Sequence, residues 1–194
     1  METRMRADAR RNRERLLTAA LAAFTEHGSD DTSLEEIARR AGVGIGTLYR
    51  HFPTRRALLE SVYRDQVDAL CVRGRAVPAE LPPAAALSNW LRALVAFSLT
   101  KRSLTSELLA GTGTKNAPVF SGCRTEMTET AAALLARARE AGQVRAGIEP
   151  ADLLRISHAA VAATEHAAAP GTEAYRLLEI MLGGVLAPAA SNEP

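Results

Sequence analysis

Apolar residues recur every three or four positions along most of the chain, which is the spacing of one face of an α-helix. No stretch shows the strict alternation of apolar and polar residues that a half-buried strand would have. The pattern therefore predicts an all-α fold of about nine helices. They are expected at residues 13–27, 33–41, 44–52, 55–73, 84–101, 103–110, 118–141, 151–169 and 172–186.

Two short helices joined by a tight turn are predicted between residues 32 and 52. Ser33 followed by Glu36 has the capping-box spacing that begins a helix, and Gly42 stands where a left-handed cap would end it. In the second helix, Leu48 and Phe52 lie one turn apart and are expected to face inward. A polar, aromatic and cationic face remains outside, as in helix-turn-helix units that place their second helix in the DNA major groove.

The motif at this helix pair resembles that of the tetracycline-repressor family of transcriptional regulators. It reads Ile-Ala-Arg-Arg-Ala-Gly-Val at residues 37–43 and Gly-Thr-Leu-Tyr-Arg-His-Phe-Pro at 46–53. The resemblance covers residues 13 to about 59 by motif, and the rest only by length and helical pattern. It implies a three-helix DNA-binding head at residues 1–54 and a helical bundle for ligand binding and dimerisation at 55–194, with a linking helix at 55–73.

Groove geometry and the resemblance together give candidate DNA-contact residues. Thr47 is expected outside near the helix start, where it can touch a thymine methyl, a base edge or a phosphate. Tyr49 and His51 match family positions that hold phosphates, and Arg50 can reach a phosphate or a guanine edge. Ile45 replaces what is often a polar base reader, so DNA shape is expected to carry more of the specificity. The whole set is Ser33, Gly44, Ile45, Gly46, Thr47, Tyr49, Arg50, His51 and Arg55.

Positive charge is concentrated near the helix pair, although the net charge of the chain is only +2. Residues 1–75 hold 14 Arg against 11 acidic residues. Arg55 stands where the family usually has Lys, which keeps the charge for a phosphate contact. The Arg-rich segment from Arg4 to Arg15 is either a solvated helix start with a frayed tail or an arm that reaches phosphates or a narrow minor groove.

The second half of the chain carries two further candidate surfaces. In this family the bundle interior commonly holds a small inducer, and the alternative for each residue is ordinary core packing. The residues expected to line it are Trp90, Leu94, Phe97, Cys123, Met127, Leu134 and His158. An Ala-rich segment and the last helix look like the family's two-helix share of a four-helix dimer interface. The interface candidates are Leu153, Ile156, Ala160, Ala163, Leu177, Leu178, Met181, Leu182 and Val185.

Other classes of site are not favoured by the sequence. Cys71 and Cys123 lack Cys-x-x-Cys spacing, and His158 and His166 lack the i, i+4 spacing of a zinc helix, so neither a metal nor a cofactor is expected. The glycine-containing stretch at residues 111–116 lacks the spacing of a phosphate-binding loop. Without a secretory signal or an apolar run of about 18 residues, the expectation is a cytoplasmic protein without a membrane span.

The resulting hypothesis is a sequence-specific, DNA-binding transcriptional regulator. Its expected partners are a double-stranded, near-palindromic operator, a second copy of the chain and a small-molecule effector that releases the repressor from DNA. One alternative is an activator or a ligand-independent DNA-binding protein with the same head. A helical enzyme or binding module is a further alternative, although no motif for nucleophilic, metal-dependent or dinucleotide-dependent catalysis occurs in the chain.

Overall fold

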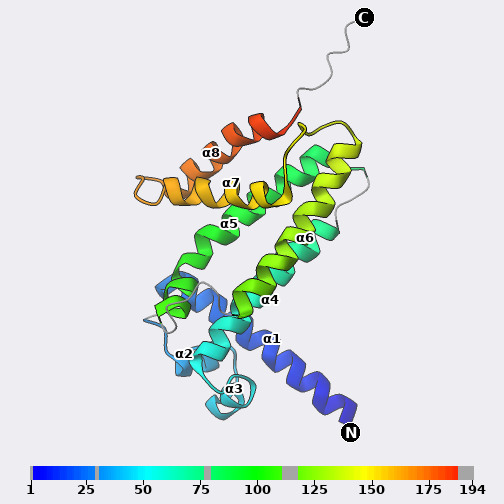
Figure 1. Ribbon diagram of the computed structural model, residues 1–194. Coiled ribbons are helices and arrows are strands. Elements are labelled where there is room, and N and C mark those ends of the chain that lie inside the picture. Colours follow the sequence, from blue (N-terminus) through cyan, green and yellow to red (C-terminus); the bar gives the residue numbers. More distant parts are fainter. Residues whose placement is uncertain (1, 29–30, 77–79, 111–117, 188–194) are drawn as a thin grey trace, which may run out of the picture. The chain divides into compact units, whose positions relative to one another are not determined.

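The computed structural model describes residues 2–28, 31–76, 80–110 and 118–187, and for residues 2–5, 101–110 and 118 it describes the backbone alone. In this part of the chain all regular secondary structure is α-helical (Figure 1). The eight helices are α1 (Glu2–His27), α2 (Leu34–Arg40), α3 (Ile45–His51), α4 (Arg55–Arg75), α5 (Pro83–Ala110), α6 (Pro118–Glu140), α7 (Pro150–Ala163) and α8 (Pro170–Val185). The predicted all-α class is confirmed.

The chain divides into two compact units. Unit 1 comprises residues 1–66 and 100–119, and unit 2 comprises residues 67–99 and 120–194, so α4 and α5 each contribute to both. The core of unit 1 is formed by apolar side chains of α1 to α4 that are at most 3% exposed. These are Leu16, Leu17, Ala20, Ala23, Phe24, Ile37, Ala38, Leu48, Phe52, Leu58, Leu59, Val62 and Tyr63. Two helices too short to be stable alone, α2 and α3, are thus held by packing on α1 and on each other.

The ends of α2 and α3 follow the sequence signals. The Ser33 hydroxyl accepts a hydrogen bond from the Glu36 amide at 3.1 Å, which satisfies a free donor at the start of α2. Gly42 has φ +64°, and the amides of Gly42 and Val43 donate to the carbonyls of Arg39 and Ala38, both at 3.0 Å. This is a Schellman cap, so the turn between the two helices is short.

Unit 2 contains α6, α7 and α8 together with parts of α4 and α5. Gln143 connects three of its segments: its side-chain Oε1 accepts from the Ala84 amide at 2.9 Å, and its backbone oxygen accepts from the Ala187 amide at 3.0 Å. An isolated antiparallel bridge joins the neighbouring residue Val144 to Leu186. The start of α5, the turn after α6 and the end of α8 are therefore tied together.

Four predicted helix boundaries are wrong. Residues 84–101 and 103–110 form one helix, α5, because no Gly or Pro separates them, and this merger accounts for eight described helices instead of nine. α7 ends at Ala163, where the Thr164 hydroxyl turns back onto the Ala160 carbonyl at 2.9 Å. α8 begins at Pro170, in the first-turn position that suits proline, with Ala169 instead of Thr172 as the N-cap. α1 begins at Glu2, well before residue 13. The stretch 111–116 lies outside the described residues.

Candidate nucleic-acid interface

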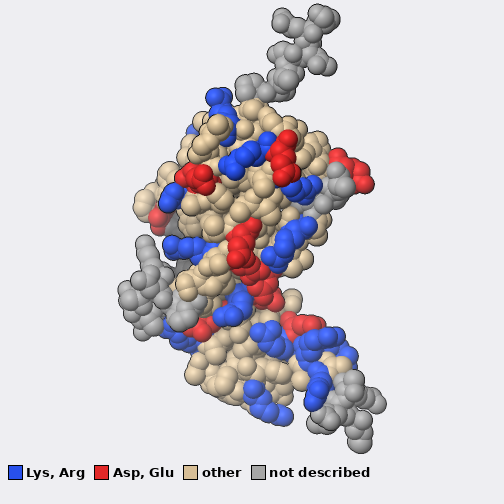
Figure 2. All heavy atoms as spheres, turned by 45° about the vertical axis from the view of Figure 1, so that its right-hand side comes forward, with Lys and Arg blue, Asp and Glu red and all other residues tan. Residues whose placement is uncertain are grey.

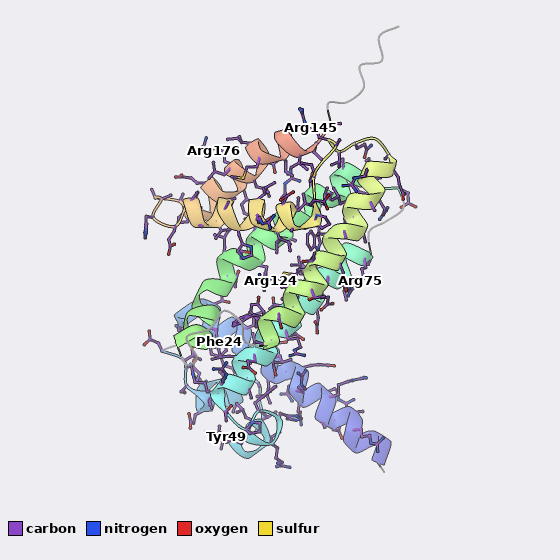
Figure 3. All side chains as sticks on the ribbon, viewed as in Figure 1. Phe24, Tyr49, Arg75, Arg124, Arg145 and Arg176 are labelled. Atoms are coloured by element: carbon purple, nitrogen blue, oxygen red, sulfur yellow. The ribbon has the colours of Figure 1, made fainter. Side chains whose placement is uncertain are left out.

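α3 presents a mixed apolar and cationic face outside the core of unit 1. Ile45 is 38% exposed and Tyr49 46%, while Leu48 and Phe52 on the opposite side are at most 2% exposed. Arg50 is exposed, and its Nε donates to the Gly46 carbonyl at 3.3 Å. Figure 3 places Tyr49 on the outer side of this short helix. Single exposed apolar side chains are common, but two of them beside a cation on one seven-residue helix make this face a candidate contact surface.

The remaining helix-pair candidates lie along the same segment. Gly44 is the N-cap of α3, and both Gly44 and Gly46 are exposed, with no atom within 4 Å of the position that a Cβ would take. Thr47 and His51 are both half-buried, whereas Tyr49 is exposed. Ser33 is exposed, with its hydroxyl already used as the cap of α2. The structure therefore brings Gly44 to His51 together on one element, with Ser33 at the start of the preceding helix, and their contacts with DNA remain a prediction.

Arg55 differs from the other candidates, because its guanidinium is directed into unit 1. Nη1 donates to the Thr32 carbonyl at 2.7 Å, and the guanidinium carbon lies 5.7 Å from the centroid of the Phe24 ring. This geometry ties the first turn of α4 to the segment before α2 and to α1. A contact of Arg55 with a phosphate, which remains a prediction, would have to coexist with these internal interactions.

An ion-pair network holds α2 on α1. The Arg40 guanidinium pairs with Glu26 at 2.6 Å and with Glu36 at 2.8 Å, and its Nη2 lies 3.0 Å from the His27 ring nitrogen. The hydrogen bond from Arg40 and its charge lower the pKa of the Glu26 carboxyl. Glu36 thus points its carboxylate at a cation one turn ahead, although the capping-box pattern predicted that it would reach back to the Ser33 amide.

The candidate ligand-binding residues of unit 2 differ in how far they are buried. Trp90, Leu94, Cys123, Met127 and Leu134 are at most 4% exposed, and the Trp90 indole N–H donates to the Leu70 carbonyl at 3.1 Å. Phe97 is half-buried. His158 is exposed on α7, with its Nδ1 3.1 Å from the Leu154 carbonyl, so it lies apart from the buried group.

Ser98 is a polar position that the sequence pattern did not single out. It is 3% exposed, and its Oγ is the one buried side-chain oxygen or nitrogen in the described residues without a hydrogen-bond partner. The other buried helix hydroxyls of unit 2 all donate to the carbonyl four residues earlier, at 2.8 to 3.0 Å: Ser88, Thr130, Ser157 and Thr164. Helical periodicity does not reveal this difference, because it depends on the side-chain rotamer.

The dimer candidates also divide into two groups. Five are buried within the chain itself at 3% exposure or less, which leaves them no surface to offer a second copy: Leu153, Ala160, Leu178, Leu182 and Val185. Four reach the surface of the paired helices α7 and α8: Ile156, Ala163, Leu177 and Met181. The same helices expose Ala159 and Ala162 of the predicted Ala-rich segment. They also expose Ile180, at 61%, and the small residues Gly183 and Gly184, which the sequence pattern did not reveal.

The described residues offer little support for a metal site, a reactive cysteine or a membrane span. Among the described residues no group of three or more His, Cys, Asp or Glu side chains is arranged to hold a metal ion. Both cysteines are buried, and burial raises the pKa of the Cys71 thiol, which disfavours the reactive thiolate. None of the described helices is long and apolar enough to cross a membrane.

Comparison with known proteins gives matches to both halves of the chain. Residues 16–62 match the family model of bacterial regulatory proteins of the tetR family, and residues 82–187 match the C-terminal domain of SbtR-like transcriptional regulators. A solved TetR transcriptional regulator from Streptomyces coelicolor is 35% identical and covers 91% of this chain and 99% of its own, with a TM-score of 0.77. A TetR regulatory protein from Mycobacterium vanbaalenii is 32% identical over 94% of this chain and 99% of its own, with a TM-score of 0.75.

Curated relatives match over a shorter stretch. An HTH-type transcriptional regulator from Staphylococcus aureus strain USA300 is 41% identical over 64 residues, which is 33% of this chain. The chain thus spans about a third, 35%, of the length of the curated relatives that it matches.

Proposed function

Because the chain belongs to the TetR family of bacterial transcriptional regulators, we propose that it is a dimeric repressor of a near-palindromic operator, released by a small-molecule ligand. The observation that carries the proposal is the exposed face of α3, where Ile45, Tyr49 and Arg50 stand out from a buried side. The major groove, about 12 Å wide, admits a helix of this kind. Family membership implies a regulatory role without catalysis.

Two copies are required for tight binding in this proposal. One seven-residue helix reads a single half-site, and a two-fold dimer reads two half-sites roughly 34–36 Å apart. The exposed small and apolar residues of α7 and α8 support a helix-to-helix interface, because small side chains allow close approach. Residues 1–54 are proposed as the DNA-binding head and 55–194 as the part for ligand and partner.

The ligand is proposed to act through linkage. If it favours a dimer whose heads no longer match the half-site spacing, DNA and ligand weaken each other by the same free energy, typically about 1–3 kcal/mol. Ser98 supports a ligand with a hydrogen-bonding group, because its buried hydroxyl lacks a partner among the described residues. α4 begins beside Thr32 and continues through Leu70 and Gly74 as one helix, so we propose that it conveys the change.

The experiment that tests the function is a gel-shift titration with the DNA upstream of the gene, followed by footprinting of any bound region. We expect a specific complex at physiological salt, protection of a near-palindrome, and loss of the complex when small molecules extracted from the freshly purified protein are added back. Absence of a specific complex would refute DNA recognition. A reporter signal that rises with expression of the protein would select an activator instead.

Substitutions on α3 should separate affinity from base preference. Tyr49→Ala is expected to weaken binding to every duplex about tenfold or more, because it removes a phosphate contact, while Thr47→Ala should relax preference at one base pair by about 1–3 kcal/mol. Val72→Ala is the matched control, since Val72 is a comparably exposed apolar side chain, 55% exposed, on α4. Binding of Tyr49→Ala indistinguishable from that of Val72→Ala in anisotropy titrations would contradict the assignment.

Removal of the Ser98 hydroxyl should have an unusual effect on stability. Ser98→Ala deletes a buried group that makes no hydrogen bond, so the ligand-free protein should be as stable or more stable, by up to about 1–3 kcal/mol. Ser157→Ala is the control, because its Oγ donates to the Leu153 carbonyl at 3.0 Å and its loss should destabilise. Equal destabilisation of both variants in urea unfolding would show that Ser98 is an ordinary bonded core hydroxyl.

A further inference from the structure

The first half of α1 carries arginines on a single helical stripe. In the second half of the helix, the buried residues Leu17, Ala20 and Phe24 follow one another at spacings of three and four. Continued toward the N-terminus, the same spacing falls on Arg13, Arg10 and Arg6. Residues three and four apart share one face of a helix, so the stripe that packs into unit 1 becomes cationic once it leaves the core.

Most of this arginine segment lies outside the core of unit 1. Residues 6–15 are exposed, apart from half-buried Ala7 and Asn12, and the first fully buried residue is Leu16. A helix that is polar all round is stable only through ion pairs or through a partner that covers it. The ion pairs of Arg10 with Glu14 at 3.6 Å and of Arg11 with Asp8 are exposed and contribute little. A polyanionic partner would therefore stabilise this stretch.

The stripe passes next to the end of α3. The Arg13 guanidinium carbon lies 5.7 Å from the centroid of the Phe52 ring, and Phe52 is the C-cap of α3. Arg11, one residue from Arg10, lies about 100° away around the helix and off the stripe. Figure 2 shows Lys and Arg atoms gathered beside the grey N-terminal residues. The face that adjoins α3 is thus the one with the aligned cations.

We propose that Arg6, Arg10 and Arg13 form a second DNA-contact surface, which binds backbone phosphates beside the half-site occupied by α3. The inference rests on the proposed function. A helix about 10–12 Å across does not enter a minor groove about 6 Å wide, so the segment lies along the phosphates and carries no base readout. Its length of about 15 Å matches the rise of roughly four base pairs.

The test compares neighbouring arginines in the full-length protein. Arg10→Gln and Arg11→Gln remove the same charge from adjacent positions of one helix, on and off the stripe, and glutamine has a helix propensity similar to that of arginine. The probe is a labelled duplex from upstream of the gene, titrated by fluorescence anisotropy from about 0.05 to 0.3 M salt, a range over which phosphate contacts lose most of their affinity. Each phosphate contact contributes about 0.9 to the slope of log affinity against log salt.

We expect Arg10→Gln to lower the slope by about 1.8 for the two copies and to weaken binding roughly tenfold or more at about 0.1 M salt. Arg11→Gln should change the slope by well under one. If the wild-type protein binds DNA but the two variants have equal salt slopes, the second DNA-contact surface is refuted and the proposed function is unaffected. Failure of the wild-type protein to bind at the lowest salt overturns both.

Discussion

Truncation of Phe24 to alanine should unfold unit 1 and abolish DNA binding. Phe24 is 1% exposed in the core on which α2 and α3 pack, and removal of a buried aromatic ring costs about 3–5 kcal/mol. The ring also lies beneath the Arg55 guanidinium, at 5.7 Å, while Arg55 donates to the Thr32 carbonyl. Loss of the ring therefore leaves a cavity and removes one support of the contact that joins α4 to the segment before α2.

Urea unfolding and anisotropy titrations measure this effect. Phe24→Leu is the matched variant, because leucine keeps most of the apolar volume and removes only the ring beneath Arg55. This variant should retain DNA binding, and its free energy of unfolding should fall by about 1–2 kcal/mol, because it loses some packing contacts and the cation–π contact with Arg55. If Phe24→Ala stayed within about 1 kcal/mol of the wild-type protein, the ring would not be central to the head.

Local chemistry allowed the helix pair to be predicted from sequence. Ser33 caps α2 and Gly42 ends it with positive φ, because each signal acts within a few residues and needs no knowledge of the rest of the fold. The inward side of α3 followed from the one-turn spacing of Leu48 and Phe52 in the same way. Periodicity likewise predicted the helix at residues 13–27, although it gave no reason for the helix to begin as early as Glu2.

Interactions between distant residues could not be predicted. Arg55 has the charge required for a phosphate, yet its guanidinium meets a carbonyl 23 residues earlier in the chain. Leu177 and Leu178 are adjacent and equally apolar, but Leu178 is fully buried and Leu177 reaches the surface. Apolar periodicity identifies the apolar face of a helix without saying whether the same chain or a second copy covers it. The predicted dimer-interface residues therefore included both buried core residues and surface residues.

Replacement of Gly74 by alanine should destabilise unit 2, although helix propensity predicts the opposite. In an open helical site, Gly→Ala stabilises by roughly 0.5–1 kcal/mol. A Cβ on Gly74 of α4, however, would lie 2.5 Å from Thr130 Cγ2 and 2.7 Å from Trp90 Nε1. Trp90 is 3% exposed and its indole N–H donates to the Leu70 carbonyl, so a shift of the indole would strain this hydrogen bond. Overpacking of this kind costs about 1–3 kcal/mol.

Gly122→Ala on α6 is the matched control, because Gly122 is exposed and no atom lies within 4 Å of the position that its Cβ would take. Urea unfolding should give changes of opposite sign, with Gly122→Ala more stable than wild type and Gly74→Ala less stable. Adding Thr130→Ser to Gly74→Ala removes the methyl at 2.5 Å and leaves the indole in place, so the rescue should be partial. If both single alanine substitutions stabilised the protein, the Trp90 side chain would have to shift without any loss of folding free energy. The hydrogen bond from its indole N–H to the Leu70 carbonyl argues against this.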